Sequence, residues 1–306
     1  MPSRSPWKPL AWNGIQLEVP ADWDPARMGR RFLLLEDAEG PTLALRWAPI
    51  AGRFDAHKTL CKLTRAVGAD ADATPNDPPA IWRNALKSGQ GPGPETYGFG
   101  WRDGAGVLLY WPDSDIAALA GFYGNPPPPT AGPVLAALRP VAGKPTRPFQ
   151  LYDIHARVPA DLNLDRFQFV PGAFELAFSG TATRLLLHRW GPASMLLDGD
   201  GLLFFARRRL PSIPREAPGD EMDRRWEQSL GGPIGKLLPG KRARFEAGRI
   251  WQVSEMDRIL GVIAAGPSRE SARKLLETAS REFRVVEEAE RNDRENARPE
   301  DAPSGR

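Results

Sequence analysis

Apolar and polar residues alternate along Ile15–Val19, which is typical of a half-buried strand, and the strand is expected to stop at Pro20, which lacks the N–H that a sheet requires. Two apolar runs follow, Arg31–Leu35 and Thr42–Trp47, separated by a short acidic stretch that ends at Gly40–Pro41. Glycine and proline between two apolar runs indicate a turn, so the two runs are expected to form a hairpin. The start of the chain is therefore predicted to be an antiparallel sheet.

The second half of the chain repeats this pattern in the same order. Matching residues are separated by between about 139 and 145 positions, which is the length of a domain rather than of a solenoid repeat. The matching segments are Trp12–Asp22 with Leu151–Asp161, Leu43–Trp47 with Leu185–Trp190, and Leu119–Val141 with Leu260–Val285. We therefore predict a first repeat over residues 1–145, a second over residues 146–288, and a charged, disordered tail over residues 289–306.

The middle parts of the two copies differ most. In the first copy, the pattern predicts a helix from Ala56 to about Val67. In the second copy, it predicts a tight turn at Asp198–Gly201 followed by a strand over Leu202–Arg207. Apolar residues at four-residue spacing then predict a helix over Asp220–Leu230.

Each copy closes with a hairpin, a strand and a helix. These segments are Tyr97–Trp101, Val107–Trp111, Ile116–Tyr123 and Thr130–Leu138 in the first copy, and Arg242–Ala247, Arg249–Val253, Arg258–Ala265 and Ser268–Phe283 in the second. Ser268 is a favourable N-cap, and Glu270 lies near the positive end of the helix dipole. The fold class expected from these elements is α+β, with two similar domains, each an antiparallel sheet packed against helices, arranged as a pseudo-dimer.

The composition narrows the class of protein. A chain of 306 residues with 41% hydrophobic content can bury two cores. It contains no run of 18 or more apolar residues, and no apolar segment follows the basic N-terminus, so no membrane association is expected and the cytoplasm is the expected compartment. The single cysteine, Cys61, fits a reducing compartment and is expected to be a buried or half-buried apolar residue.

The distribution of arginine is asymmetric, although the net charge of +3 is small. Runs of basic residues occur in the second copy, and the aligned region of the first copy has none; they supply the candidate binding residues Arg207, Arg208, Arg209, Arg242 and Arg244. Such runs are either a solvated face or a surface for an acidic protein or a nucleic-acid backbone. Aromatic residues do not alternate regularly with the arginines, so nucleic acid is the less favoured partner.

Catalytic and metal-binding motifs are missing from the sequence. His57, His155 and His188 have no partner at metal-ligand spacing. The stretch Gly231–Lys236 has glycines too close together for a phosphate loop, and Leu237 stands where a serine or threonine is needed. No catalytic residue, metal or cofactor is therefore predicted.

The order of elements resembles that of the Mog1/PsbP-like α+β domains. The resemblance is carried by a first strand that ends in Val-Pro-Ala-Asp-Trp over Val19–Trp23, an antiparallel run, and a last strand leading to a helix that ends near Arg281–Arg284. It covers residues 12–141 and 151–285, and Leu162 stands in the second copy where Trp23 stands in the first. The resemblance implies a binding or assembly role rather than catalysis, and it assigns no ligand.

These observations favour a non-catalytic binding or accessory protein, a monomer with internal pseudo-symmetry, whose partner surface lies on the second domain or in the interdomain groove. The expected partner is a protein with an acidic surface. The alternative is an enzyme with an unrecognised active site in the interdomain cleft, using a carboxylate such as Asp113, Asp115 or Glu255. Two interpretations of Pro126–Pro129 also stay open: a polyproline II ligand for a partner, or a rigid spacer.

Overall fold

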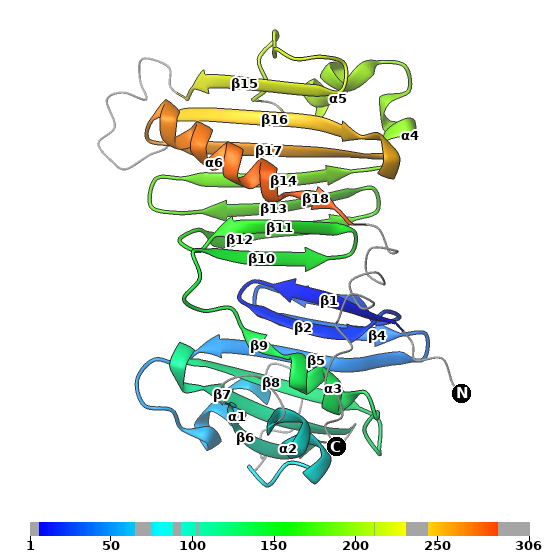
Figure 1. Ribbon diagram of the computed structural model, residues 1–306, viewed down its shortest axis with the longest axis vertical. Helices are drawn as coiled ribbons and strands as arrows, with labels where there is room; N and C mark the ends of the chain where they lie inside the picture. Colours follow the sequence, from blue (N-terminus) through cyan, green and yellow to red (C-terminus); the bar gives the residue numbers. More distant parts are fainter. Residues whose placement is uncertain are drawn as a thin grey trace, which may run out of the picture. The chain divides into compact units, whose positions relative to one another are not determined.

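The computed structural model describes residues 6–64, 75–87, 93–101, 104–210, 212–230 and 244–286 (Figure 1). The chain forms two compact units. Unit 1 contains the described part of Met1–Lys144 together with Gln150–Tyr152, and unit 2 contains Pro145–Phe149 with the described part of Asp153–Glu287. Each unit is described by itself below.

The protein is rich in β-structure, so the predicted α+β class with two domains arranged as a pseudo-dimer is wrong. Strands account for 49% and helices for 23% of the structure, and the paired strands are antiparallel. The sequence did show most of the strands. The six-stranded sheet of each unit, not its helices, sets the class.

The sheet of unit 1 has six antiparallel strands in the order β3-β4-β5-β8-β7-β6. The strands are β3 (Asp24–Gly29), β4 (Phe32–Asp37), β5 (Gly40–Pro49), β6 (Glu95–Trp101), β7 (Gly104–Trp111) and β8 (Ile116–Tyr123). Three further strands, β1 (Trp7–Trp12), β2 (Ile15–Pro20) and β9 (Arg139–Pro140), pair as β1-β2-β9. The expected hairpin of the first copy is therefore present as β4 and β5.

Helices cover both faces of this sheet. On one face, Leu60 and Leu63 of α1 (Ala56–Thr64) are in a buried cluster with Leu108 and Leu119. On the other face, Trp82 of α2 (Ala80–Lys87) packs on Phe122 with ring centroids 5.3 Å apart. Next to α2 lies α3 (Ala131–Ala137), which follows β8.

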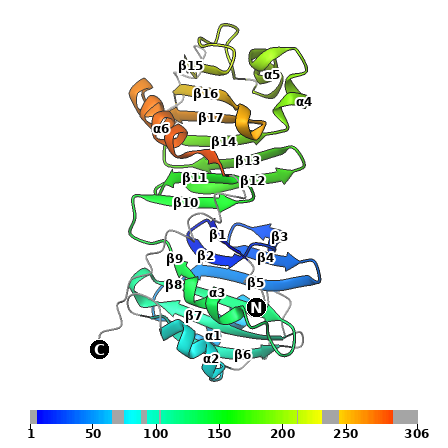
Figure 2. The same cartoon turned by 45° about the vertical axis from the view of Figure 1, so that its right-hand side comes forward.

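The sheet of unit 2 has the equivalent strand order, β12-β13-β14-β17-β16-β15. Its strands are β12 (Asn163–Val170), β13 (Ala173–Ser179), β14 (Arg184–Trp190), β15 (Asp223–Ser229), β16 (Phe245–Val253) and β17 (Arg258–Gly266). The helices are α4 (Ala193–Leu197), α5 (Gly201–Arg209) and α6 (Arg269–Glu282), and the shorter strands are β10 (Thr146–Leu151), β11 (Ile154–Pro159) and β18 (Arg284–Val285). In both views of the ribbon, α6 lies across β16 and β17 (Figures 1 and 2).

Several local features recur at matching places in the two units. Trp47 of β5 and Trp190 of β14 are both buried, as expected from their recurrence in the sequence. A short 3₁₀ turn follows both β7 and β16, and it ends at a left-handed aspartate, Asp115 in unit 1 and Asp257 in unit 2. The edge strands β3 and β12 each contain a bulge, opposite β4 and β13 respectively.

Two elements of the second copy differ from the prediction. The apolar stretch after Asp198–Gly201 is the helix α5, not a strand, and the turn before it joins α4 to α5. The segment predicted as a helix over Asp220–Leu230 is instead the strand β15. In this strand Trp226 is buried against Gly248 of β16, where no side chain occupies the space.

The end of the second copy mostly follows the prediction. The closing helix is confirmed, and the Ser268 hydroxyl accepts a hydrogen bond from the Ser271 N–H at 3.1 Å, forming a capping box. The two strands predicted around Gly248 are one continuous strand, β16. Within the described ranges, no helix is long and apolar enough to cross a membrane.

Candidate interaction surface on unit 2

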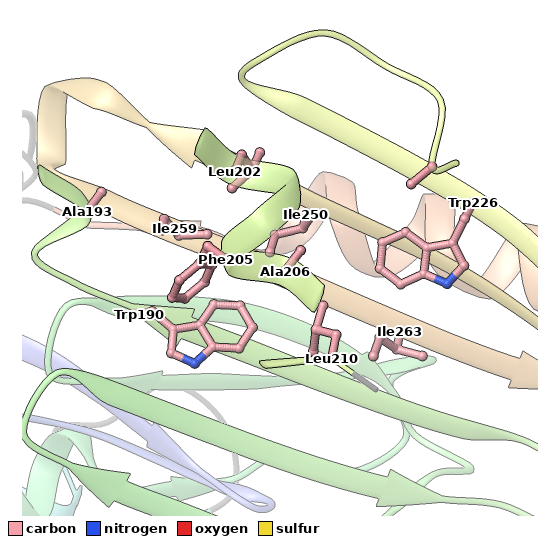
Figure 3. Close-up of a cluster of buried hydrophobic side chains, with 11 residues drawn as sticks. Trp190, Ala193, Leu202, Phe205, Ala206, Leu210, Trp226, Ile250, Ile259 and Ile263 are labelled. Carbon is pink, nitrogen blue, oxygen red and sulfur yellow. The ribbon is translucent and has the colours of Figure 1, made fainter. Parts of the chain in front are cut away.

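The helix α5 is fixed to the sheet of unit 2 by one buried face. Leu202, Phe205 and Ala206 recur at three- and four-residue spacing and point toward the sheet (Figure 3). The Phe205 ring meets the Trp190 ring edge-on, with centroids 5.4 Å apart and an angle of 81°. The inner face of α5 is therefore part of the core, and its outer face has a defined orientation.

The outer face of α5 carries one aromatic residue and two arginines. Phe204, Arg207 and Arg208 are at positions i, i+3 and i+4, so they lie on the same side of the helix. Phe204 is 45% exposed, and the Arg208 guanidinium lies 4.8 Å from the centre of its ring. The Nη2 of Arg207 donates a hydrogen bond to the carbonyl of Arg215. These three residues are called the α5 surface below.

Charge at this surface is not neutralised by neighbouring acids. Arg207, Arg208 and Arg209 form the last turn of α5, where cations interact favourably with the helix dipole. Within the described ranges, none of the three forms an ion pair with a carboxylate. Arg209 differs from the other two because its guanidinium lies 6.0 Å from the buried Phe205 ring. The arrangement suits an acidic group approaching from solvent.

The preceding helix, α4, is anchored by an aspartate from the turn after β16. Asp257 accepts hydrogen bonds from the Ser194 N–H at 2.7 Å and the Ser194 hydroxyl at 2.8 Å. These bonds hold the pKa of the Asp257 carboxyl below its ordinary value. Met195, the next residue of α4, is 76% exposed. A second large apolar side chain is thus presented to solvent by the pair of helices that carries the α5 surface.

The other two candidate arginines, Arg242 and Arg244, are not assigned to the α5 surface. Arg242 lies outside the described residues. Arg244 is exposed just before β16, and its backbone N–H donates to the Gly266 carbonyl at 2.8 Å. The structure therefore places Arg207 and Arg208 together, with Arg209 beside them, and gives no reason to add Arg244.

The acids considered for an enzyme lie on the two 3₁₀ turns. Asp113 and Asp115 belong to the turn of unit 1, and Glu255 belongs to the matching turn of unit 2. Asp115 accepts a hydrogen bond from the Tyr110 hydroxyl at 3.0 Å, and this bond raises the pKa of Tyr110 above its ordinary value. Asp115 thus has a structural partner in its own unit.

The histidine with the most unusual environment is His188. It is 8% exposed and stacks on Trp190 with ring centroids 4.9 Å apart. Burial lowers the pKa of His188 to about 4. The carboxylate of Glu175, whose Oε2 lies 3.7 Å from His188 Nδ1, raises this pKa but does not offset the effect of burial. In the part of the chain that the structure describes, its Nε2 has no hydrogen-bond partner, and no group of three potential ligands is arranged to hold a metal ion. His188 is therefore a neutral core residue.

The apolar part of the surface was missed from the sequence. The stretch over Leu202–Arg207 reads as a strand, and in a strand Phe204 and Arg207 would face opposite sides of a sheet. Only the helical spacing brings Phe204 beside Arg208. Met195 gives no sequence signal, because its exposure depends on how α4 packs.

No protein-family model matches the chain, and no curated protein is similar enough in sequence to match it. The resemblance to the Mog1/PsbP-like domains stays a prediction, and the role of the α5 surface must be argued from its geometry.

Proposed function

We propose that this chain is a non-catalytic binding or accessory protein that holds an acidic partner protein through the α5 surface. The observation that carries the proposal is the exposed Phe204 ring, which lies beside Arg208 on a helix whose other face is fixed in the core. Among the large apolar side chains exposed in the described ranges, Phe204 is the aromatic one. Arginine, phenylalanine and methionine are enriched at the centres of protein interfaces, and this helix pair exposes all three.

The comparison of the two units supports placing the proposed interface on unit 2 and not on unit 1. Its corresponding helix, α1 (Ala56–Thr64), contains no arginine. Two units with the same strand order thus differ in the chemistry of this helix. The tandem duplication predicted from the sequence gives a simple account: one copy acquired a binding face while the common sheet was kept. The cytoplasm is the proposed compartment, since the single Cys61 suits a reducing environment.

The test compares capture by three forms of the full-length chain from a native lysate, with quantitative mass spectrometry of the retained proteins. The forms are the unaltered protein, the triple variant Phe204→Ser, Arg207→Gln, Arg208→Gln, and the control Arg273→Gln. Arg273 is exposed on α6 of the same unit, so the control removes one positive charge away from the α5 surface.

The expected result is an acidic, salt-sensitive partner whose capture falls about tenfold or more in the triple variant and not in the control. The unfolding temperature of the triple variant should stay within about 4 °C of the original, because the three side chains are largely outside the core. Equal retention by the triple variant, or the absence of any retained protein, would contradict the proposal.

A further inference from the structure

A cavity of about 850 Å³ lies in unit 1, where three connecting segments meet. The segments are the turn between β2 and β3, the turn between β4 and β5, and the connection from β8 to α3. Cavities of roughly 300–1,000 Å³ are the usual size of ligand sites. This one is separate from the α5 surface, which belongs to unit 2.

The walls of the cavity are aromatic rings and prolines. Trp7, Trp23 and Tyr123 line it, together with several residues of the Pro126–Pro129 run. The Tyr123 ring is held against Trp101, with centroids 5.0 Å apart. The proline run is therefore part of a wall, which supports its interpretation as a spacer that shapes this region.

Trp23 gives this wall an unused hydrogen-bond donor. Its side chain is 3% exposed, and its indole N–H has no acceptor among the described residues. By contrast, the indole N–H groups of Trp12 and Trp47 donate to backbone carbonyls. An occupant that supplies a carbonyl would accept from the Trp23 indole N–H, as backbone carbonyls do from Trp12 and Trp47.

The charge of the lining is acidic throughout. Asp22, Asp37 and Glu39 line the cavity, and no lysine or arginine does so. Asp37 Oδ1 accepts hydrogen bonds from the Glu39 N–H at 2.8 Å and the Gly40 N–H at 3.2 Å, which fixes the shape of its turn. Within the described ranges, none of the three carboxylates forms an ion pair. They come from two separate turns, so they suit an occupant with more than one positive charge.

Unit 2 lacks the features that build this cavity. Its strand β17 leads to α6 through Pro267 and Ser268 alone, whereas residues 124–130 connect β8 to α3 in unit 1. Leu162 replaces Trp23, and a turn at Gly180 without acidic residues replaces the acidic turn after β4. The aromatic and acidic lining is therefore an addition to the common architecture, not a requirement of it.

We propose that this cavity binds an extended, basic, proline-containing peptide segment of a partner protein. Proline-rich segments dock in grooves lined by aromatic rings, because their preformed conformation loses little entropy on binding. The backbone carbonyls of such a segment would accept from the Trp23 indole. Its arginine side chains would pair with the carboxylates and stack on the aromatic walls. This site is additional to the α5 surface and takes a ligand of the opposite charge.

The test measures binding of a fluorescein-labelled peptide made of three Arg-Pro-Pro repeats to the full-length chain by fluorescence anisotropy. Three competitors are added separately: the unlabelled peptide, a matched Glu-Pro-Pro peptide, and free arginine. The informative variant is the double change Asp22→Asn, Glu39→Gln. The matched control is Glu18→Gln, because Glu18 is exposed on β2 and does not line the cavity.

The expected result is saturable binding that weakens about tenfold or more in the double variant, and by less than about twofold in the control. The Glu-Pro-Pro peptide should not compete. Competition by free arginine as strong as that of the peptide would overturn the peptide assignment and indicate a small-cation site. Unchanged affinity in the double variant, or no saturable binding at all, would also overturn the proposal.

The two proposed sites can be tested independently. The triple variant of the α5 surface should bind the Arg-Pro-Pro peptide with unchanged affinity. Loss of peptide binding in that variant would contradict a site confined to unit 1. Failure of the peptide experiment would leave the acidic-partner experiment unaffected.

Discussion

The adjacent residues Phe204 and Phe205 offer a matched pair of truncations that tests how α5 is held. Phe205 is 1% exposed and Phe204 is 45% exposed, although they are neighbours on one helix. We expect Phe205→Ala to destabilise the protein strongly and Phe204→Ala to destabilise it little. The chemical change is the same in both variants, so their difference reports burial alone.

The magnitude follows from what each ring contacts. Truncating a fully buried phenylalanine removes its transfer free energy and leaves a cavity, which costs about 3–5 kcal/mol. The edge-on contact of Phe205 with Trp190 favours the upper part of this range. Phe204 makes one cation–π contact and is nearly half exposed, so we expect a cost of about 1 kcal/mol or less.

Urea unfolding and thermal unfolding, both followed by near-ultraviolet circular dichroism, measure these costs. For a unit of this size, 1 kcal/mol corresponds to about 2–4 °C in the unfolding temperature, so Phe205→Ala should lower it by about 6–20 °C. Amide hydrogen exchange over β14 and β17 should rise in the same variant, because these strands form the floor under α5. Costs within about 1 kcal/mol of each other in the two variants would refute the packing described for α5.

Two other predictions concern the sheet of unit 2. Burial lowers the pKa of His188 in the folded state to about 4, below its value in the unfolded chain. The contribution of the neutral imidazole to the free energy of unfolding should therefore be fully present above about pH 6.5. It should decline by at most about 3 kcal/mol as the pH falls toward 4. His188→Leu should flatten the free energy of unfolding over this range, and an unaltered pH profile would show that another group is responsible. Gly248→Ala would place a Cβ about 2.1 Å from the Trp226 ring and should lower the free energy of unfolding by about 1–3 kcal/mol. The control Gly100→Ala should lower it clearly less, because a Cβ at Gly100 would have nothing within 4 Å. Equal unfolding temperatures in the two variants would contradict the close packing of Trp226.

The closing helix could be predicted because its signal is local. Ser268 caps α6 through a bond to a residue three positions away, so the start of this helix is visible in the sequence. The matching tryptophans Trp47 and Trp190 also marked equivalent strands, although they are one residue apart in register, opposite Ala118 and Ile259 respectively. Elements that depend on nearest neighbours in the chain were therefore within reach.

The errors arise where distant residues decide the structure. Trp226 seemed to belong to a helical face, but it packs across the sheet on Gly248, and nothing near it in the sequence shows this. Short apolar runs such as Leu202–Arg207 fit a strand and a buried helix equally well. These two misassignments exchange a helix for a strand and a strand for a helix within unit 2.

The candidate sites show the same limit. The arginine run on α5 is visible in the sequence, but its aromatic neighbour Phe204 is recognised only once the helix is known. The lining of the unit 1 cavity comes from segments as far apart as Trp7 and Tyr123. Only the proline run at Pro126–Pro129 marked this region in the sequence, and its role as a wall depends on the turns that face it.

The bulges in β3 and β12 bear on whether these outer strands can pair with a strand of another molecule. An outer strand with a regular row of free N–H and C=O groups can pair with the same strand of another molecule. The irregular pairing at Pro25–Arg27 and at Leu164–Arg166 interrupts that row at matching points. At the opposite outer strands, Asn76 bridges to Gly98 of β6, and β15 carries charges at Asp223–Arg225 and Glu227. Intermolecular sheet extension is thus discouraged at β3, β6, β12 and β15.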